Sequence, residues 1–94
     1  MQNTYTKLTA TELEDFLVLT GKTVMSRGLK QITRDFLWNH AVLTFGTSYG
    51  KDGKPIGPGA QQITNEMMHC VAKRISPTGI YVDKSTKVRN KIVF

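Results

Sequence analysis

The sequence predicts a small α+β domain with three helices and a C-terminal β-hairpin. Three observations lead to this fold class: a helix-start signal near residue 9, two further segments with apolar residues at helical spacing, and two apolar runs that flank a polar turn at the end of the chain. The chain has 94 residues, of which 39% are hydrophobic and 21% are charged. This length and composition suit one globular domain, residues 1–94, with a single core.

The first predicted helix covers residues 10–20. Thr9 stands where an N-cap is expected, and Glu12 lies three residues later, which completes a capping box. Acidic residues in the first turns favour a helix N-terminus because they complement the helix dipole. Gly21 is the residue type that commonly ends a helix, so we expect the helix to stop there.

A second helix is predicted to begin near residue 27 and to cover either 27–39 or 27–45. Leu29, Ile32 and Phe36 recur at spacings of three and four residues. From Phe36 to Phe45, apolar residues occupy every side of a helical wheel. This pattern fits either a longer helix or a helix that ends near residue 39 and is followed by a strand. This dense apolar segment is expected at the centre of the core. Its alternative is an interface around Trp38 with a partner or a second copy of the chain.

Residues 46–59 are rich in glycine and are predicted to form a loop, or a hairpin that turns at Asp52-Gly53. Lys51 and Lys54 in this segment could contact an anion or a partner protein. The segment does not match either glycine-rich nucleotide-binding motif.

The third helix is predicted over residues 60–75, and a β-hairpin over 79–94. Proline and glycine after Ser76 are expected to end the helix. One side of this helix carries apolar residues and Cys70, which we expect in the core; the other side is polar.

The net charge of +6 is unevenly distributed. Residues 22–94 hold twelve basic and four acidic residues, whereas residues 1–21 are net acidic. The last eleven residues contain four basic residues and no acid. A basic surface of this kind favours acidic partners, which include nucleic acids.

The polar side of the third helix and the terminal hairpin form the candidate nucleic-acid-binding site. Amide side chains can bond base edges, and Lys and Arg can neutralise phosphates. The candidate residues are Gln62, Asn65, His69, Lys73, Lys84, Lys87, Arg89 and Lys91. The arrangement resembles a winged helix-turn-helix by architecture only, because no family motif is matched. Solubility alone would also account for polar residues on an exposed helix face, and lysine on a hairpin discourages strand pairing between molecules.

Several function classes are disfavoured by the residues that carry chemistry. No paired carboxylates, activated serine or partnered thiol indicate an enzyme. His69 and Cys70 are adjacent and point in different directions on a helix, so we expect no metal and no cofactor. The apolar runs are too short for a membrane span, and no signal peptide is recognised. A lone cysteine suits a cytoplasmic protein.

The sequence therefore supports two hypotheses. The first is a small, non-catalytic nucleic-acid-binding protein, with DNA favoured over RNA, that could act as a regulator. The second is a small adaptor or inhibitor, like the accessory proteins of phages and mobile elements, that binds an acidic surface of a larger protein. Its contact surface would be the 46–59 loop or the region around Trp38.

Overall fold

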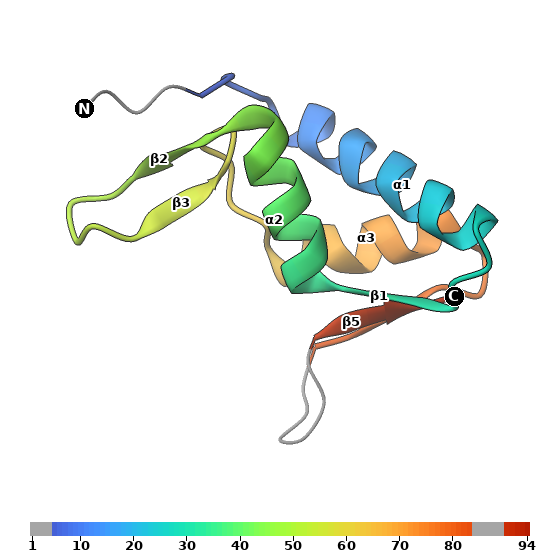
Figure 1. Cartoon of the computed structure of the whole chain (residues 1–94). Coiled ribbons are helices and arrows are strands. Elements are labelled where there is room, and N and C mark those ends of the chain that lie inside the picture. Colours follow the sequence, from blue (N-terminus) through green and yellow to red (C-terminus); the bar gives the residue numbers. More distant parts are fainter. Residues whose placement is uncertain (1–4, 84–89) are drawn as a thin grey trace.

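The computed structural model describes residues 5–83 and 90–94, which form an α+β domain (Figure 1). The described residues contain three helices, a three-stranded antiparallel sheet and a separate two-stranded hairpin. In chain order, the elements are α1 (Ala10–Ser26), β1 (Gln31–Thr33), α2 (Arg34–Phe45), β2 (Thr47–Tyr49), β3 (Pro55–Pro58), α3 (Asn65–Ile75), β4 (Ile80–Val82) and β5 (Lys91–Val93).

Helix α1 begins where the sequence predicts and is longer than predicted. The capping box is confirmed, since the Thr9 hydroxyl accepts from the Glu12 amide at 3.1 Å and the Glu12 carboxylate accepts from the Thr9 amide at 2.9 Å. Gly21 does not end the helix. It is buried where α1 crosses α3, and a Cβ at this position would overlap the side chain of Ile75. The glycine therefore serves the close approach of two helices.

The predicted start of the second helix at residue 27 is wrong. Residues 31–33 form strand β1, in which Ile32 lies opposite Ile92 of β5. Helix α2 starts only after Thr33, whose hydroxyl accepts from the Phe36 amide at 3.1 Å and so caps it. The helix then runs to Phe45, which is the longer of the two predicted ends.

The glycine-rich segment contains a hairpin, which we call the β2–β3 arm (residues 47–58). Its strands are antiparallel, and its turn is closed by the Gly50 amide, which donates to the Lys54 carbonyl at 2.9 Å. At the base, the Thr47 hydroxyl donates to the Gly57 carbonyl at 2.6 Å and accepts from the Gly57 amide at 3.1 Å. The arm projects away from the three-stranded sheet (Figure 1).

Helix α3 begins at Asn65, later than the predicted residue 60. Gly59 and Ala60 have φ angles of 58° and 65°, which a right-handed helix does not allow. Thr64 supplies the N-cap, and the helix ends at Ile75 as predicted.

The inward side of α3 also differs from the prediction. It consists of Met68, Val71, Ala72 and Ile75, whereas Cys70 is exposed. The expectation that Cys70 lies in the core is wrong because the contact with α1 at Gly21 turns Ile75 and the residues one turn before it inward.

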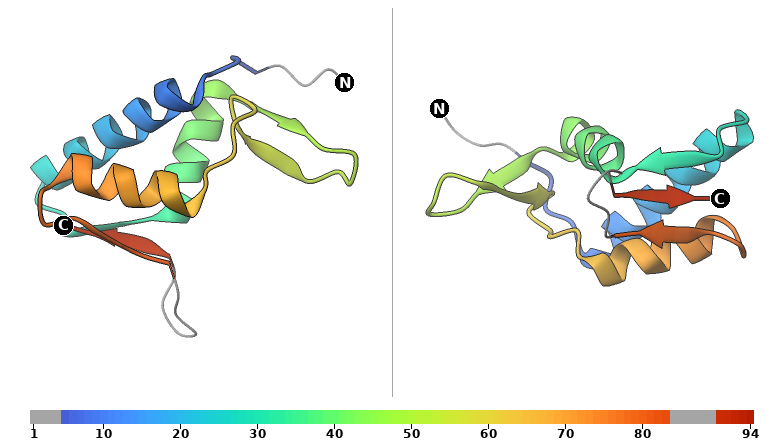
Figure 2. Two further views of the ribbon diagram at one scale, coloured as in Figure 1. Left: turned by 180° about the vertical axis from the view of Figure 1, so that it is seen from behind. Right: turned by 90° about the horizontal axis from the view of Figure 1, so that it is seen from below.

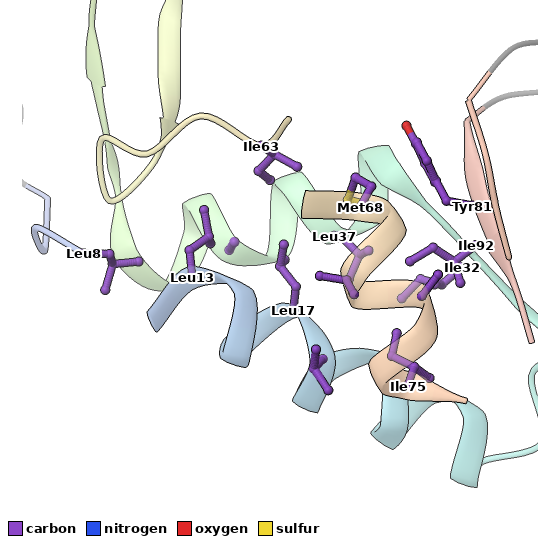
Figure 3. Close-up of a cluster of buried hydrophobic side chains, with 14 residues drawn as sticks. Leu8, Leu13, Leu17, Ile32, Leu37, Ile63, Met68, Ile75, Tyr81 and Ile92 are labelled. Carbon is purple, nitrogen blue, oxygen red and sulfur yellow. The ribbon is translucent and has the colours of Figure 1, made fainter. Parts of the chain in front are cut away.

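The three-stranded sheet has the order β1-β5-β4, so the predicted terminal hairpin is confirmed and β1 joins it as a third strand. Alternate residues of its strands point inward toward the helices (Figure 3). The resulting core consists of Leu8, Leu13, Leu17, Val18, Ile32, Leu37, Ala41, Ile63, Met68, Val71, Ala72, Ile75, Tyr81 and Ile92.

The dense apolar segment in α2 does not form the centre of the core. Within the helix only Leu37 and Ala41 are buried, because α2 contacts the core along one side. Leu43 is 86% exposed and Phe36 is 50% exposed, while Trp38 is partly buried against the edge of the core. An apolar surface is therefore left on the outside of α2.

We predict that Gly21→Val lowers the free energy of unfolding by about 2–3 kcal/mol, because the new side chain overlaps Ile75 in a close-packed contact. In urea denaturation, Gly21→Val combined with Ile75→Ala should cost at least about 1 kcal/mol less than the sum of the two single changes. Lys22→Val is the matched control, since it adds the same side chain at an exposed position of α1. Strict additivity of the two changes would contradict the proposed contact.

Candidate nucleic-acid interface

The polar side of α3 is exposed, as the sequence predicts. Asn65, His69 and Lys73 follow one another at one-turn spacing along the helix, and Gln62 lies in the segment just before it. Asn65, His69 and Lys73 are exposed because the opposite side of α3 is held in the core. Gln62 is exposed in a segment that the sequence predicts to be helical and that is not helical in the structure. Seen from behind, α3 lies in front of α1 and beside the terminal strands (Figure 2, left).

His69 connects this polar side to the end of strand β4. Its ring packs edge-on against Tyr81, with 5.2 Å between the ring centroids. Its Nε2 atom lies 3.5 Å from Oδ2 of Asp83, the last described residue before position 90. The helix face and the outgoing end of β4 are therefore adjacent. Because the Asp83 carboxylate lies beside the ring, His69 is less suited to a phosphate contact.

Arg34 positions the start of α3 and was not predicted to do so. Its guanidinium donates to the Asn65 side-chain oxygen at 2.9 Å, to the Tyr81 hydroxyl at 3.1 Å, and to the backbone carbonyl of Ile63. Its backbone amide donates to the Asn90 carbonyl at 2.9 Å. One residue thus joins α2 to the start of α3, to β4 and to the beginning of the last strand.

The two cations in the last turn of α3 have different environments. Arg74 forms ion pairs with Glu14 and Asp15 of α1, each at 2.7 Å. Hydrogen bonds to Asp15 and then to Glu14 raise the pKa of Arg74 above its ordinary value. Lys73 is exposed on the polar side. Two acidic residues of α1 therefore bind Arg74 and attach α3 to α1, whereas Lys73 faces solvent.

Lys91 lies on β5, the central strand of the sheet, opposite Thr33 and Val82. Its neighbour Ile92 is buried, so Lys91 belongs to the outward face of the sheet, where it is half-buried. The other predicted cations of the hairpin, Lys84, Lys87 and Arg89, lie outside the described residues.

Lys51 and Lys54 are exposed at the turn of the β2–β3 arm. The arm extends away from the three-stranded sheet, so these lysines lie at its far end and apart from α3 (Figure 2, right). The arm presents a separate basic tip.

The described residues contain no group of three or more His, Cys, Asp or Glu side chains that could hold a metal ion. Within the same part of the chain, no helix has the length and apolar character needed to cross a membrane.

The contact between Arg34 and Tyr81 joins residues far apart in the sequence, so no local pattern could have indicated it.

Comparisons of this chain with protein-family profiles, with characterised proteins and with solved structures return no match. The function is therefore inferred from the fold class, a small α+β domain, and from the residues of the candidate interface.

We predict that Arg34→Gln lowers the free energy of unfolding by about 2–4 kcal/mol, because it leaves the buried Tyr81 hydroxyl and the Ile63 carbonyl without their charged donor. Tyr81→Phe removes one of these bonds and should cost about 1 kcal/mol. Lys73→Gln serves as the control and should change stability by less than about 0.5 kcal/mol. If Arg34→Gln were as stable as this control in denaturant titration, Arg34 would not hold the start of α3.

Proposed function

We propose that this protein is a small, non-catalytic nucleic-acid-binding protein that binds DNA in preference to RNA. The observation that carries the proposal is the exposed polar side of α3, which continues onto the end of β4 through the contacts of His69 with Tyr81 and Asp83. We call it the α3–hairpin surface. Its members on and just before α3 are Gln62, Asn65, His69 and Lys73; Lys91 is included as a cation of the hairpin, and its side chain lies on the outward face of the sheet.

The order of the elements supports this proposal. A helix, a strand and two helices precede a terminal hairpin, and the last strand lies between the other two in the sheet. With the β2–β3 arm set aside, this is the order expected of a winged helix-turn-helix. In a helix-turn-helix protein the second helix of the motif enters the major groove, and α3 would hold that place here.

The residues of the surface suit the two kinds of contact that DNA offers. Lys73 and Lys91 would neutralise phosphates, which contributes affinity without sequence preference. Gln62 and Asn65 would contact base edges. The oxygen of the Asn65 amide already accepts from Arg34, so Asn65 would act through its NH₂ group as a donor. Glu66, exposed in the first turn, could accept from a cytosine amino group.

The basic segment 84–94 supports the same proposal from the sequence. It contains four basic residues and begins shortly after the end of β4. The protein would act as a regulator in the cytoplasm. Its single cysteine suits this location, because a chain with one cysteine cannot form an internal disulfide and needs no oxidising compartment.

We predict that binding to a duplex DNA weakens linearly on a plot of log K against log salt concentration. Lys73→Gln should reduce the magnitude of the slope by about 0.9, the value for one lost phosphate contact on duplex DNA. Fluorescence anisotropy with a labelled duplex at several salt concentrations measures both quantities. Lys22→Gln, on the outer side of α1, removes the same charge elsewhere and should leave the slope unchanged. Salt-independent binding, or equal slopes for the two variants, would reject the proposed surface.

We also predict that Asn65→Ala relaxes sequence preference. In a selection from random duplexes, the wild-type protein should enrich a short consensus, and the variant should lose about 1 kcal/mol of discrimination at one position, the value for a single hydrogen bond. Because Asn65 also accepts from Arg34, the folded state of the variant is checked by circular dichroism. Equal enrichment of all sequences by the wild-type protein would show that α3 does not contact base edges.

A further inference from the structure

A continuous apolar groove runs between α1, α2 and β1, on the other side of the molecule from α3. Figure 1 shows α2 in front of the domain, whereas the view from behind in Figure 2 shows α3 in front. The groove consists of two depressions that share Val24 and Phe36, the larger with a volume of about 300 Å³. Its apolar lining is formed by Phe16, Leu19, Val24, Leu29, Ile32 and Phe36.

Three large apolar side chains on the rim of the groove are exposed to solvent. Leu19 is 64% exposed, Leu29 is 56% exposed and Phe36 is 50% exposed. Leu19 comes from α1, Leu29 from the turn after α1, and Phe36 from α2; Leu19 lines one depression, Leu29 lines the other, and Phe36 lines both. Contiguous apolar surface of this kind marks interaction sites in soluble domains, whereas single exposed apolar residues do not.

The wall of the groove is already ordered by aromatic stacking. The His40 ring lies between two phenylalanines, with ring centroids 5.4 Å from Phe16 and 6.1 Å from Phe36 and nearly parallel planes. Phe16 in turn packs edge-on against Phe45 at 4.7 Å. A pre-formed wall costs little ordering entropy when a partner binds.

The charge of the groove favours an acidic partner. Among the described residues that line it, Arg27 is the only one with a full charge. Lys30 directly follows Leu29 in the chain and adds to the positive character of this end. Asp35 directly precedes Phe36 in the chain but does not line either depression, so the charge of the lining itself is that of Arg27.

The charge also argues against a second copy of the chain as the occupant. A two-fold contact through this groove would bring the same surface of both copies together and would place both Arg27 side chains in one interface. Each copy would then meet a surface whose lining, among the described residues, carries Arg27 and no acidic residue, so Arg27 would gain no ion pair.

The length of the groove suits a short helix. From Phe16 to Arg27 it follows α1 for about 16 Å, which corresponds to about three helical turns. A partner helix with large apolar residues at i, i+4 and i+7 would place its apolar side over Leu19 and Phe36. Acidic residues beside that apolar side would reach Arg27.

We propose that the α1–α2 groove binds an amphipathic helix of a partner protein whose apolar side is bordered by acidic residues. This surface is separate from the α3–hairpin surface and does not depend on nucleic-acid binding. The protein would then join a nucleic acid on one side to a second protein on the other.

The test uses two synthetic helical peptides of about fourteen residues, both with leucine at i, i+4 and i+7. One carries glutamate beside the leucines, and the other carries lysine at the same positions. We expect the acidic peptide to bind about tenfold or more tightly than the basic peptide in fluorescence anisotropy. Arg27→Glu should reverse this preference, because Arg27 is the charged residue of the groove.

Leu19→Ser should weaken binding of the acidic peptide by about tenfold or more, and it should leave the fold intact because Leu19 is exposed. Leu43→Ser is the matched control, since Leu43 is also exposed and lies on α2 outside the groove. Equal binding of the two peptides, or equal effects of the two leucine variants, overturns the proposal. Sedimentation that shows a wild-type dimer lost in Leu19→Ser also overturns it, because a second copy would then be the occupant.

The two proposals fail in different ways. If duplex DNA does not bind but the acidic peptide does, the proposed function is wrong and the groove proposal holds. If DNA binds with the expected salt dependence and neither peptide binds at concentrations up to about 1 mM, the groove proposal alone is wrong.

Discussion

The packing of α3 against α1 at Gly21 is the contact on which the rest of the structure depends. With no side chain on Gly21, the two helices come close enough to bury Ile75 between them. Once Ile75 points inward, Val71 and Met68 must do so as well, because they lie on the same side of the helix. The polar side of α3 then faces outward. Arg34 completes this placement by joining the first turn of α3 to α2 and β4.

Features that depend on neighbouring residues in the chain could be predicted from the sequence. The Thr9 capping box, the end of α3 before Ser76-Pro77, and the antiparallel pairing of β4 with β5 all belong to this group. Features decided by distant contacts could not. Gly21 has the sequence signature of a helix end until its contact with Ile75 is known, and β1 is too short to be recognised without its partner β5.

The candidate site shows the same division. The exposure of Asn65, His69 and Lys73 followed from their amphipathic spacing. Their surroundings did not, since the contacts with Arg34 and with β4 join segments far apart in the chain. The sequence favoured the core for the apolar segment of α2 and left an interface around Trp38 as the alternative. The exposed apolar residues of this segment are Phe36 and Leu43, while Trp38 is partly buried. A helix that is apolar on all sides predicts burial on all sides, and a small domain has too little interior to provide it.

The β2–β3 arm is attached to the domain through its two ends, which lie close together at its base. The Gly59 amide donates to the Gly46 carbonyl at 2.9 Å, so the chain leaves the arm close to the point where it entered. The domain body therefore holds only the two ends of the hairpin. The entropy of closing a loop grows slowly with its length, so the arm can lengthen or shorten with little change in the positions of α2 and α3. Evolution, or an engineer who grafts a recognition peptide at Asp52-Gly53, can change what the arm contacts while the rest of the fold is conserved.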